Sequence, residues 1–205
     1  MSKKICLLVD WQNTFVHPKG GLYVKDAEKL TAKINEYIKF AMFDEVWACV
    51  DWHPARHVSF ASTHGKELFS AITLDDGSTQ VMWPDHGMQG TWDGDFAEGL
   101  ETNKIKFIVR KGTDVNVDSY SAFFDNGGKP TGLGNLIQDG DSLVCIGVAG
   151  DYCVKATAID GRKFCKNVIF NDDLCAWVDE NNKENVFEEL KEANVGIQVS
   201  RRQGE

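Results

Sequence analysis

The stretch Leu143-Val-Cys-Ile-Gly-Val-Ala-Gly-Asp-Tyr-Cys-Val-Lys-Ala-Thr157 changes character in its middle, from an apolar run to a segment rich in small residues. Residues 143–146 have the continuous apolar pattern of a strand that is buried on both faces. The glycines Gly147 and Gly150 predict a turn after this strand, and we expect Asp151 to cap the helix that follows. A strand, a turn and a helix in this order are the building unit of an α/β fold.

Cys153 falls in the first turn of this predicted helix. A thiol at the positive end of a helix dipole has a lowered pKa, so more of the nucleophilic thiolate is present at neutral pH. This position is typical of a cysteine that carries out covalent catalysis. A buried cysteine that packs as a small apolar side chain would give the same pattern. The stretch alone leaves both interpretations open.

Apolar runs of the same kind recur along the chain and predict further strands. They cover residues 5–9, 46–50, 105–109, 167–170 and 196–199. Apolar residues at helical spacing predict helices over 26–42, with Met42 as the last apolar position, and over 183–193. Strands that alternate with helices are typical of an α/β fold with a doubly wound, mostly parallel sheet and helices on both faces. Residues 53–99, which show no such pattern, are predicted to form one long functional loop.

The composition favours one acidic domain over residues 1–205, in which 22 Lys and Arg oppose 31 Asp and Glu to give a net charge of −9. We therefore expect neither nucleic acid nor a membrane surface as a partner. No stretch has the length of a membrane span, and the first apolar run is too short for a signal peptide. The six cysteines show no Cys-x-x-Cys spacing, which is typical of reduced thiols in a cytoplasmic protein.

Polar residues with catalytic potential follow several of the predicted strands. Asp10, Asp51 and Lys111 come just after strands, as does the turn at 147–153. Because ligands of such sheets bind at the carboxyl ends of the strands, we expect these residues to lie together. Each also has an ordinary explanation, since an Asp after a strand is commonly a turn or cap residue and a lone Lys is usually solvated.

Asp10, Lys111 and Cys153 form a chemically coherent set. A carboxylate can accept the thiol proton, and an ammonium can keep the carboxylate ionised and in position. The thiolate could then attack a carbonyl carbon, and Asp10 could return the proton to the leaving group. The backbone N–H groups of Ala149 and Cys153 are the expected oxyanion hole.

Histidines and a carboxylate predict a metal site. Asp51 and His53 are two residues apart and lie on the same side of an extended segment, and His86 follows at the end of the long loop. One carboxylate and two histidines suit one divalent ion, Zn²⁺ first and Fe²⁺ or Mn²⁺ as alternatives. His57 is either a further ligand or a group that orients one. The alternative is that these are ordinary surface histidines.

Three aromatic residues, Phe15, Trp83 and Tyr120, stand close to these motifs in predicted loops. Aromatic side chains are usually core residues, but in loops at the carboxyl edge they would suit the walls of a pocket for a flat ligand. We interpret His17 and His64 as ordinary loop residues.

The assembled motifs resemble the nicotinamidases of the isochorismatase-like cysteine hydrolase family. The resemblance rests on residues 9–15 (VDWQNTF), 51–60 (DWHPARHVSF), 83–86 (WPDH), 111–112 (KG) and 147–158 (GVAGDYCVKATA), in the order that the family has them. It implies a Rossmann-type three-layer sandwich. It also implies a catalytic triad of Asp10, Lys111 and Cys153, and metal ligation by Asp51, His53 and His86.

The same resemblance implies that the enzyme hydrolyses nicotinamide to nicotinate and ammonia through a Cys153 thioester, a reaction of NAD salvage, and that it accepts pyrazinamide. It implies a cis peptide between Val148 and Ala149, which directs the Ala149 N–H into the oxyanion hole. It further implies that the metal holds the pyridine nitrogen, with Phe15 and Trp83 around the ring.

The chain departs from the family at Gly87, where many members have cysteine, and at Gly150, where threonine is common. Two rival functions remain. One is hydrolysis of another small amide or an isochorismatase-type reaction on the same scaffold, and the other is non-enzymatic metal binding. The predicted metal ligands argue against a metal-free isochorismatase, and the intact triad argues against a protein without activity. A homo-oligomer is compatible with the sequence.

Overall fold

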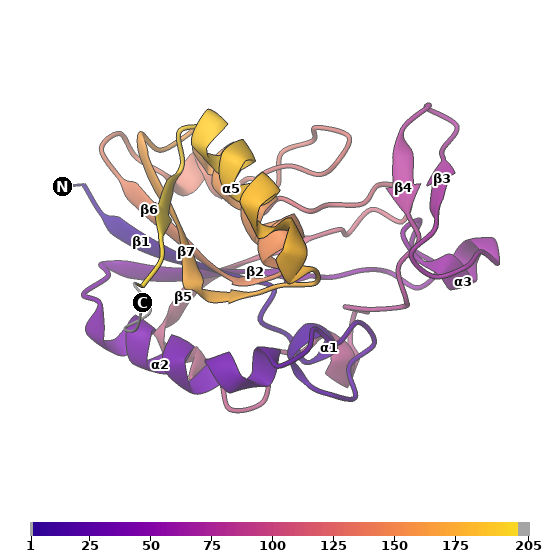
Figure 1. The fold of residues 1–205 in the computed structure, drawn as a ribbon, viewed down its shortest axis with the longest axis horizontal. Coiled ribbons are helices and arrows are strands. Elements are labelled where there is room, and N and C mark those ends of the chain that lie inside the picture. Colours follow the sequence, from indigo (N-terminus) through magenta and orange to yellow (C-terminus); the bar gives the residue numbers. More distant parts are fainter. Residues whose placement is uncertain (1, 201–205) are drawn as a thin grey trace.

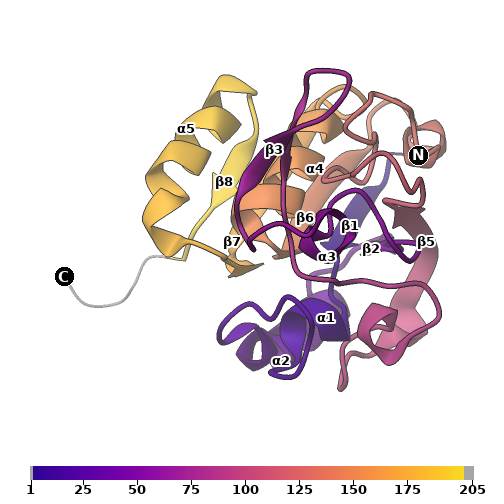
Figure 2. The same cartoon turned by 90° about the vertical axis from the view of Figure 1, so that its right-hand side faces the viewer.

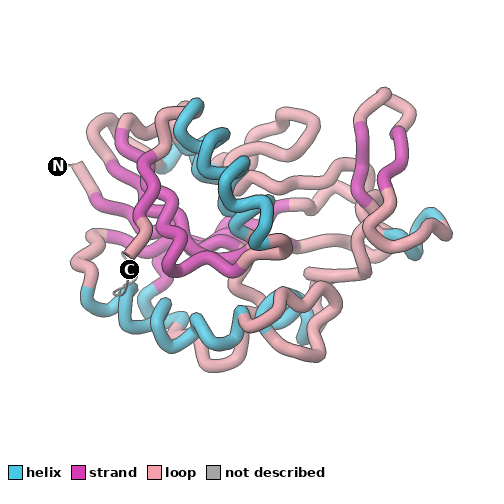
Figure 3. The backbone as a smooth tube through the Cα atoms, viewed as in Figure 1, coloured by secondary structure: helices cyan, strands magenta, loops and turns pink. Residues whose placement is uncertain are grey.

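A six-stranded parallel sheet forms the centre of the computed structural model, which describes residues 2–200 (Figures 1 and 3). Its strands are β1 (Lys4–Val9), β2 (Glu45–Asp51), β5 (Ile105–Lys111), β6 (Ser142–Val148), β7 (Asn167–Ala176) and β8 (Gly196–Gln198). They lie in the order β5-β2-β1-β6-β7-β8, and every pairing between neighbours is parallel. The predicted doubly wound α/β fold is confirmed.

Helices cover both faces of this sheet. Helix α2 (Thr31–Phe40) lies on one face, and α4 (Lys155–Gly161) and α5 (Lys183–Glu192) lie on the other (Figures 1 and 2). Shorter helical segments are α1 (Asn13–Val16), α3 (Ala61–His64), the 3₁₀ turns Ala27–Leu30, Trp92–Gly94, Thr102–Lys104, Leu133–Leu136 and Glu180–Asn182, and the π turn Gly150–Val154. Among residues 2–200, no helix combines the length and the apolar character that crossing a bilayer requires.

The side chains of β1 explain why its sequence is a continuous apolar run. Successive residues of a strand point to opposite faces of the sheet. Leu7 belongs to a buried cluster that includes Leu190 of α5, whereas Leu8 belongs to a second cluster that includes Ile34 of α2. Because both faces are covered, every position of the strand has to be apolar.

The strand order reverses between β1 and β6. The chain continues from β1 to β2 on one side, and from β6 to β7 on the other. At such a point the connections diverge and leave a crevice beyond the carboxyl ends, where ligands of open α/β sheets bind. Asp10 follows β1 and the segment 149–153 follows β6, so both enter this crevice.

The structure corrects the predicted helix over 26–42. A 3₁₀ turn precedes α2, and α2 ends at Phe40. Met42 is not part of the buried helix face, because its backbone is in the left-handed region, with a φ of 51°, and its side chain is 88% exposed. The chain turns here to enter β2, and the Asp44 N–H already donates to the Lys4 carbonyl.

The long predicted loop also has more structure than its sequence indicates. Residues 53–99 contain α3 and an antiparallel hairpin of β3 (Ala71–Thr73) and β4 (Thr79–Val81). This hairpin stands beyond the carboxyl ends of the central strands, at the edge that faces the viewer in Figure 2. Strand β7 is also longer than predicted, since it continues through three polar residues, 171–173, to Ala176.

Candidate active site

Lys111 is the centre of a buried charged cluster at the carboxyl edge. Its Nζ lies 2.6 Å from Asp51 Oδ1, 2.9 Å from Asp10 Oδ2 and 3.5 Å from Cys153 Sγ. It also donates to the Ser119 carbonyl at 2.9 Å. The strand register places Asp51 beside Lys111. Asp10 follows the end of β1, and Cys153 lies on the turn that follows the neighbouring strand β6. The structure therefore brings the three residues of the predicted triad together.

The Lys111 ammonium faces the carboxylates of Asp10 and Asp51, and the pKa values of these two carboxylates shift in opposite directions. Burial raises the pKa of Asp10 to about 7, although Lys111 acts in the opposite direction. Burial also raises the pKa of Asp51, but Lys111 and His53 outweigh it and hold that pKa well below its usual range. Asp51 therefore stays ionised, whereas Asp10 can gain and lose a proton near neutral pH, as a general acid–base group must.

Replacing Lys111 by methionine is expected to destabilise the fold by about 3–5 kcal/mol, because it leaves two buried carboxylates without their cation. Urea unfolding of the variant measures this loss. Lys106→Met is the matched control, since this half-exposed lysine pairs with Glu45, which keeps Lys3 as a second cation at 3.0 Å; the variant should cost less than about 1 kcal/mol. Equal unfolding midpoints for the two variants would contradict the role given to Lys111.

Cys153 lies on the π turn Gly150–Val154, in which the Val154 N–H donates to the Ala149 carbonyl at 3.0 Å. The predicted effect of the helix dipole on this thiol is wrong. The side chain is only 8% exposed, and burial raises its pKa well above the usual value, with Lys111 offsetting part of the rise. The resting group is a thiol, so nucleophilic attack requires a base. Asp10, whose carboxylate lies within 4.8 Å of the Cys153 sulfur, is in place to be that base.

Asp151 does not cap the helix, which corrects a second prediction. Its Oδ1 accepts a hydrogen bond from the Val178 N–H at 3.1 Å, and its Oδ2 accepts one from the Asp179 N–H at 2.9 Å. The carboxylate thus joins the loop after β7 to the turn that carries Cys153. Val178 lines the cavity above Cys153, so this contact fixes part of the cavity wall.

At both glycines where the chain departs from the family, another residue lies too close to the backbone to leave room for a Cβ atom. Gly87 has a φ of 54°, and a Cβ atom there would lie 2.8 Å from the Cβ of Asp51. A Cβ atom on Gly150 would lie 2.7 Å from the indole ring of Trp177, which packs on the bare backbone of the turn. The packing of Trp177 on this turn therefore explains why position 150 is a glycine.

Gly150→Thr is expected to destabilise the protein by about 1–3 kcal/mol, because the added side chain overlaps the Trp177 ring. The free energy of unfolding in urea measures this effect. Gly196→Thr is the control, since a Cβ atom there would make only ordinary contacts, the nearest at 3.5 Å. If the two variants unfold at the same urea concentration, the packing explanation fails.

Asp51, His53 and His86 are buried, and their ligand atoms lie within 4.8 Å of one another. His53 places Nδ1 2.9 Å from the Gly112 carbonyl, and His86 places Nδ1 2.7 Å from the Pro84 carbonyl. If each Nδ1 carries the proton, both Nε2 atoms present lone pairs, at 3.6 and 3.8 Å from Asp51 Oδ2. These separations are too long for hydrogen bonds.

The donor set fits a divalent cation. His53 Nε2 is buried and has no hydrogen-bond partner, which is rare for a polar atom unless something else occupies its lone pair. Burial lowers the pKa of His86 to about 4, which keeps that imidazole in the neutral form that binds metals. Two imidazoles and one carboxylate are a ligand set that zinc, iron and manganese accept.

His57 is not part of this donor set, although its ligand atom lies within 4.8 Å of those of His53 and Asp118. Its ring stacks on that of His53, with centroids 4.0 Å apart. Its Nδ1 lies 2.8 Å from Ser59 Oγ and its Nε2 lies 3.3 Å from the Val117 carbonyl, so both nitrogens have partners within the protein. Of the two predicted roles, this arrangement favours orienting His53 over direct ligation. His64 ends α3 and binds the Val58 carbonyl through Nε2.

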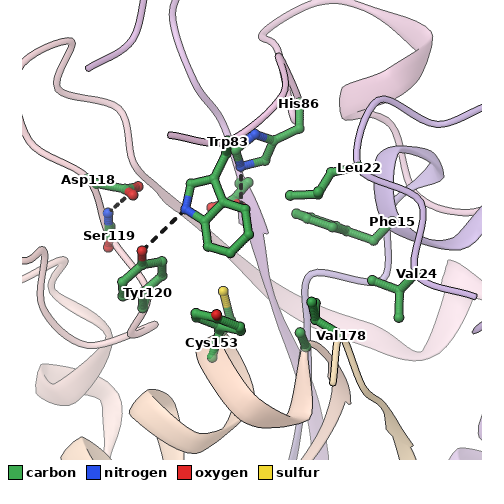
Figure 4. A pocket seen from close by; sticks show the side chains of 13 residues that line it. Phe15, Leu22, Val24, Trp83, His86, Asp118, Ser119, Tyr120, Cys153 and Val178 are labelled. Atoms are coloured by element: carbon green, nitrogen blue, oxygen red, sulfur yellow. Dashed lines mark hydrogen bonds and ion pairs between the residues drawn. The ribbon is translucent and has the colours of Figure 1, made fainter. Parts of the chain in front are cut away.

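A mostly apolar cavity of about 410 Å³, including its mouth, connects these two groups of polar residues (Figure 4). Cys153 lines one side of it, and His86 and Asp51 line another. The three predicted aromatic residues line it, and Trp83 Nε1 donates to the Tyr120 hydroxyl at 3.2 Å. The remaining wall residues are Leu22, Val24, Asp118, Ser119, Ala149, Tyr152 and Val178.

Sequence reasoning missed several of these wall residues, and it also missed Cys49 beside Asp10. Leu22 and Val24 come from the loop before α2, where their apolar side chains carry no chemical signal. The thiol of Cys49 lies 3.5 Å from Asp10 Oδ1, and the place of Cys49 near the site could have been predicted from its position in the sequence. It stands two positions before Asp51 on the same strand, and therefore on the same face of the sheet. The structure also contains the cis peptide between Val148 and Ala149 that the family resemblance implied.

Comparison with known proteins agrees with this geometry. A family model described as an isochorismatase domain matches residues 4–203. The nicotinamidase of Acinetobacter baylyi is 37% identical over 194 residues, which cover 92% of this chain and 89% of that protein. The yeast nicotinamidase Pnc1p, solved with the inhibitor nicotinaldehyde, has a TM-score of 0.87 and 32% identity, with coverage of 96% of this chain and 100% of that one.

A pyrazinamidase of Pyrococcus horikoshii, solved in complex with zinc, has a TM-score of 0.74 and 28% identity, covering 96% of this chain and 99% of that chain. The match of the family model extends over nearly the whole sequence, and the strand order and the buried residues at the carboxyl edge agree with it. The chain belongs to the isochorismatase family.

Proposed function

We propose that this enzyme hydrolyses nicotinamide to nicotinate and ammonia, with Cys153 as the nucleophile, in a step of NAD salvage. The observation that carries the proposal is one apolar cavity with a buried thiol–carboxylate–ammonium cluster on one side and three metal donors on another. Nicotinamide has a matching pair of functional groups, a carboxamide and a pyridine nitrogen, on one flat ring. The names of the Acinetobacter baylyi and yeast relatives support the same substrate.

Asp51, His53 and His86 would hold one divalent cation, for which the zinc complex of the Pyrococcus horikoshii relative favours zinc. When bound, the cation would supply a Lewis-acid position for the pyridine nitrogen of the substrate. Phe15, Trp83 and Tyr120 supply flat walls for the ring. Together these contacts would present the carboxamide to Cys153, and orientation of this kind accounts for a large part of many enzymatic rate accelerations.

In the first half of the reaction, Asp10 accepts the proton of the Cys153 thiol, and sulfur attacks the carbonyl carbon. The C–S bond forms while the carbonyl oxygen becomes an oxyanion, which the backbone N–H groups of Ala149 and Cys153 stabilise. Asp10 then donates its proton to the amide nitrogen. The C–N bond breaks, ammonia leaves, and a nicotinoyl thioester remains on Cys153.

In the second half, Asp10 accepts a proton from water as the water oxygen attacks the thioester carbon. The C–S bond breaks, and the proton on Asp10 passes to the sulfur. Nicotinic acid leaves and loses its remaining proton to water, which gives nicotinate. Lys111 remains charged throughout and holds Asp10 in position. The pKa of Asp10, raised to about 7 by burial, suits a residue that takes up and releases a proton in each half.

The proposal is tested by incubating the purified protein with nicotinamide and measuring nicotinate and ammonia, with benzamide, pyrazinamide and isochorismate as comparison substrates. We expect equimolar nicotinate and ammonia, comparable turnover of pyrazinamide, and much slower turnover of benzamide, which lacks the ring nitrogen. Turnover of isochorismate without turnover of either pyridine or pyrazine amide would replace this function by the isochorismatase-type alternative.

A further inference from the structure

Asp10 has a second thiol beside it. The Sγ of Cys49 lies 3.5 Å from Asp10 Oδ1, and both residues are fully buried. Cys49 is near the end of β2, in register with Val9 of β1, and its carbonyl accepts a hydrogen bond from the Asp10 N–H at 3.0 Å. The same residue therefore contacts Asp10 through both its backbone and its side chain.

The two thiols that flank Asp10 have different surroundings. Cys153 lines the cavity and has the Lys111 ammonium 3.5 Å from its sulfur. Cys49 does not line the cavity and belongs to a buried apolar cluster that also contains Trp47 and Phe123. A substrate can reach Cys153 but not Cys49. The Cys49 thiol can act only as a hydrogen-bond donor to the carboxylate.

This donor restricts a rotation of the Asp10 carboxylate that the contact with Lys111 leaves open. The backbone of Asp10 is fixed in the left-handed region, with a φ of 50°. Lys111 holds Oδ2 at 2.9 Å, but a single contact to one oxygen allows the carboxylate plane to rotate. A second contact, from Cys49 to Oδ1, fixes that plane relative to the Cys153 sulfur.

We propose that Cys49 is a positioning residue, which orients the Asp10 carboxylate for proton transfer from Cys153. The reaction that Cys49 assists is the proposed one, so the inference rests on the proposed function. The orientation of the Asp10 carboxylate does not depend on a bound substrate. A hydrogen bond to a charged group is lost when Cys49 becomes alanine, and serine restores a donor at the same position. The binding of the substrate ring, which uses other residues, does not depend on it.

The test compares Cys49→Ala, Cys49→Ser and the control Cys145→Ala, which removes an equally buried thiol from the same apolar cluster. We expect Cys49→Ala to lower kcat for nicotinamide by about tenfold with KM within about twofold. Cys49→Ser should recover to within about threefold of the parent protein, and Cys145→Ala should keep the parent kcat. Equal losses in Cys49→Ala and Cys145→Ala, or no recovery in Cys49→Ser, would overturn the proposal.

A second readout needs no substrate. The rate at which iodoacetamide alkylates Cys153 at neutral pH, followed by peptide mapping, reports how readily this thiol loses its proton. It should fall by about threefold or more in Cys49→Ala and stay at the parent rate in Cys145→Ala. An unchanged alkylation rate in Cys49→Ala would overturn the proposal. If the parent protein fails to hydrolyse nicotinamide but the alkylation rates differ as expected, the positioning role stands and the proposed function falls.

Discussion

Cys153→Ala is expected to lower the turnover of nicotinamide by a factor of about 10⁴ or more, while the affinity for nicotinamide stays within about threefold. The variant loses the only thiol that both lines the cavity and contacts Lys111 among residues 2–200. The aromatic walls and the metal donors are untouched, so the ring should still bind. Ammonia release measures turnover, and calorimetric titration with nicotinamide measures affinity.

Cys175→Ala is the matched control for this prediction. Its thiol is also buried and lies at the end of β7, where it donates to the Asn171 carbonyl rather than contacting the charged cluster. We expect this variant to keep parent activity. A Cys153→Ala protein that still releases ammonia at a rate near that of Cys175→Ala would exclude Cys153 as the nucleophile.

His53→Ala is expected to weaken zinc binding by at least about 100-fold, because it removes one of only three protein donors. Nicotinamide affinity should fall with the metal, since the pyridine nitrogen loses its partner. The metal content of the purified protein, measured by mass spectrometry, gives a readout that does not depend on activity. Treatment of the parent protein with a chelator should reproduce the loss of affinity, and added zinc should reverse it.

His64→Ala is the control for metal binding, because His64 contacts the Val58 carbonyl and does not belong to the donor set. It should retain parent metal content. If His53→Ala contains as much metal as His64→Ala and binds nicotinamide equally well, the three-residue metal site is wrong.

The sequence was sufficient to predict where the site lies. Continuous apolar runs specify parallel strands that are buried on both faces, and the carboxyl ends of parallel strands share one edge. Residues that follow different strands, such as Asp10 and Lys111, must therefore meet, and the structure places them 2.9 Å apart. The donor set of Asp51, His53 and His86 followed from residue types and spacing in the same way.

The features that were mispredicted or missed depend on contacts between distant segments. Asp151 has the residue type of a helix cap, but its carboxylate binds N–H groups of residues 178 and 179, which no local pattern reveals. The pKa of Cys153 is governed by its burial under the cavity walls more than by its place in a helix. Cys49 acts on Asp10 across two neighbouring strands, and its role depends on their register.

The central claim is that Cys153 attacks the carboxamide carbon of nicotinamide, and nicotinaldehyde labelled with ¹³C at its carbonyl carbon tests it most directly. An aldehyde in the place of the amide should form a thiohemiacetal with the thiol that attacks the substrate. We predict a tetrahedral ¹³C NMR signal, distinct from that of the hydrated aldehyde, in the parent protein and its absence in Cys153→Ala. An aldehyde that competes with nicotinamide but keeps a trigonal carbon in the parent protein, or gives the same tetrahedral signal in Cys153→Ala, would contradict the claim.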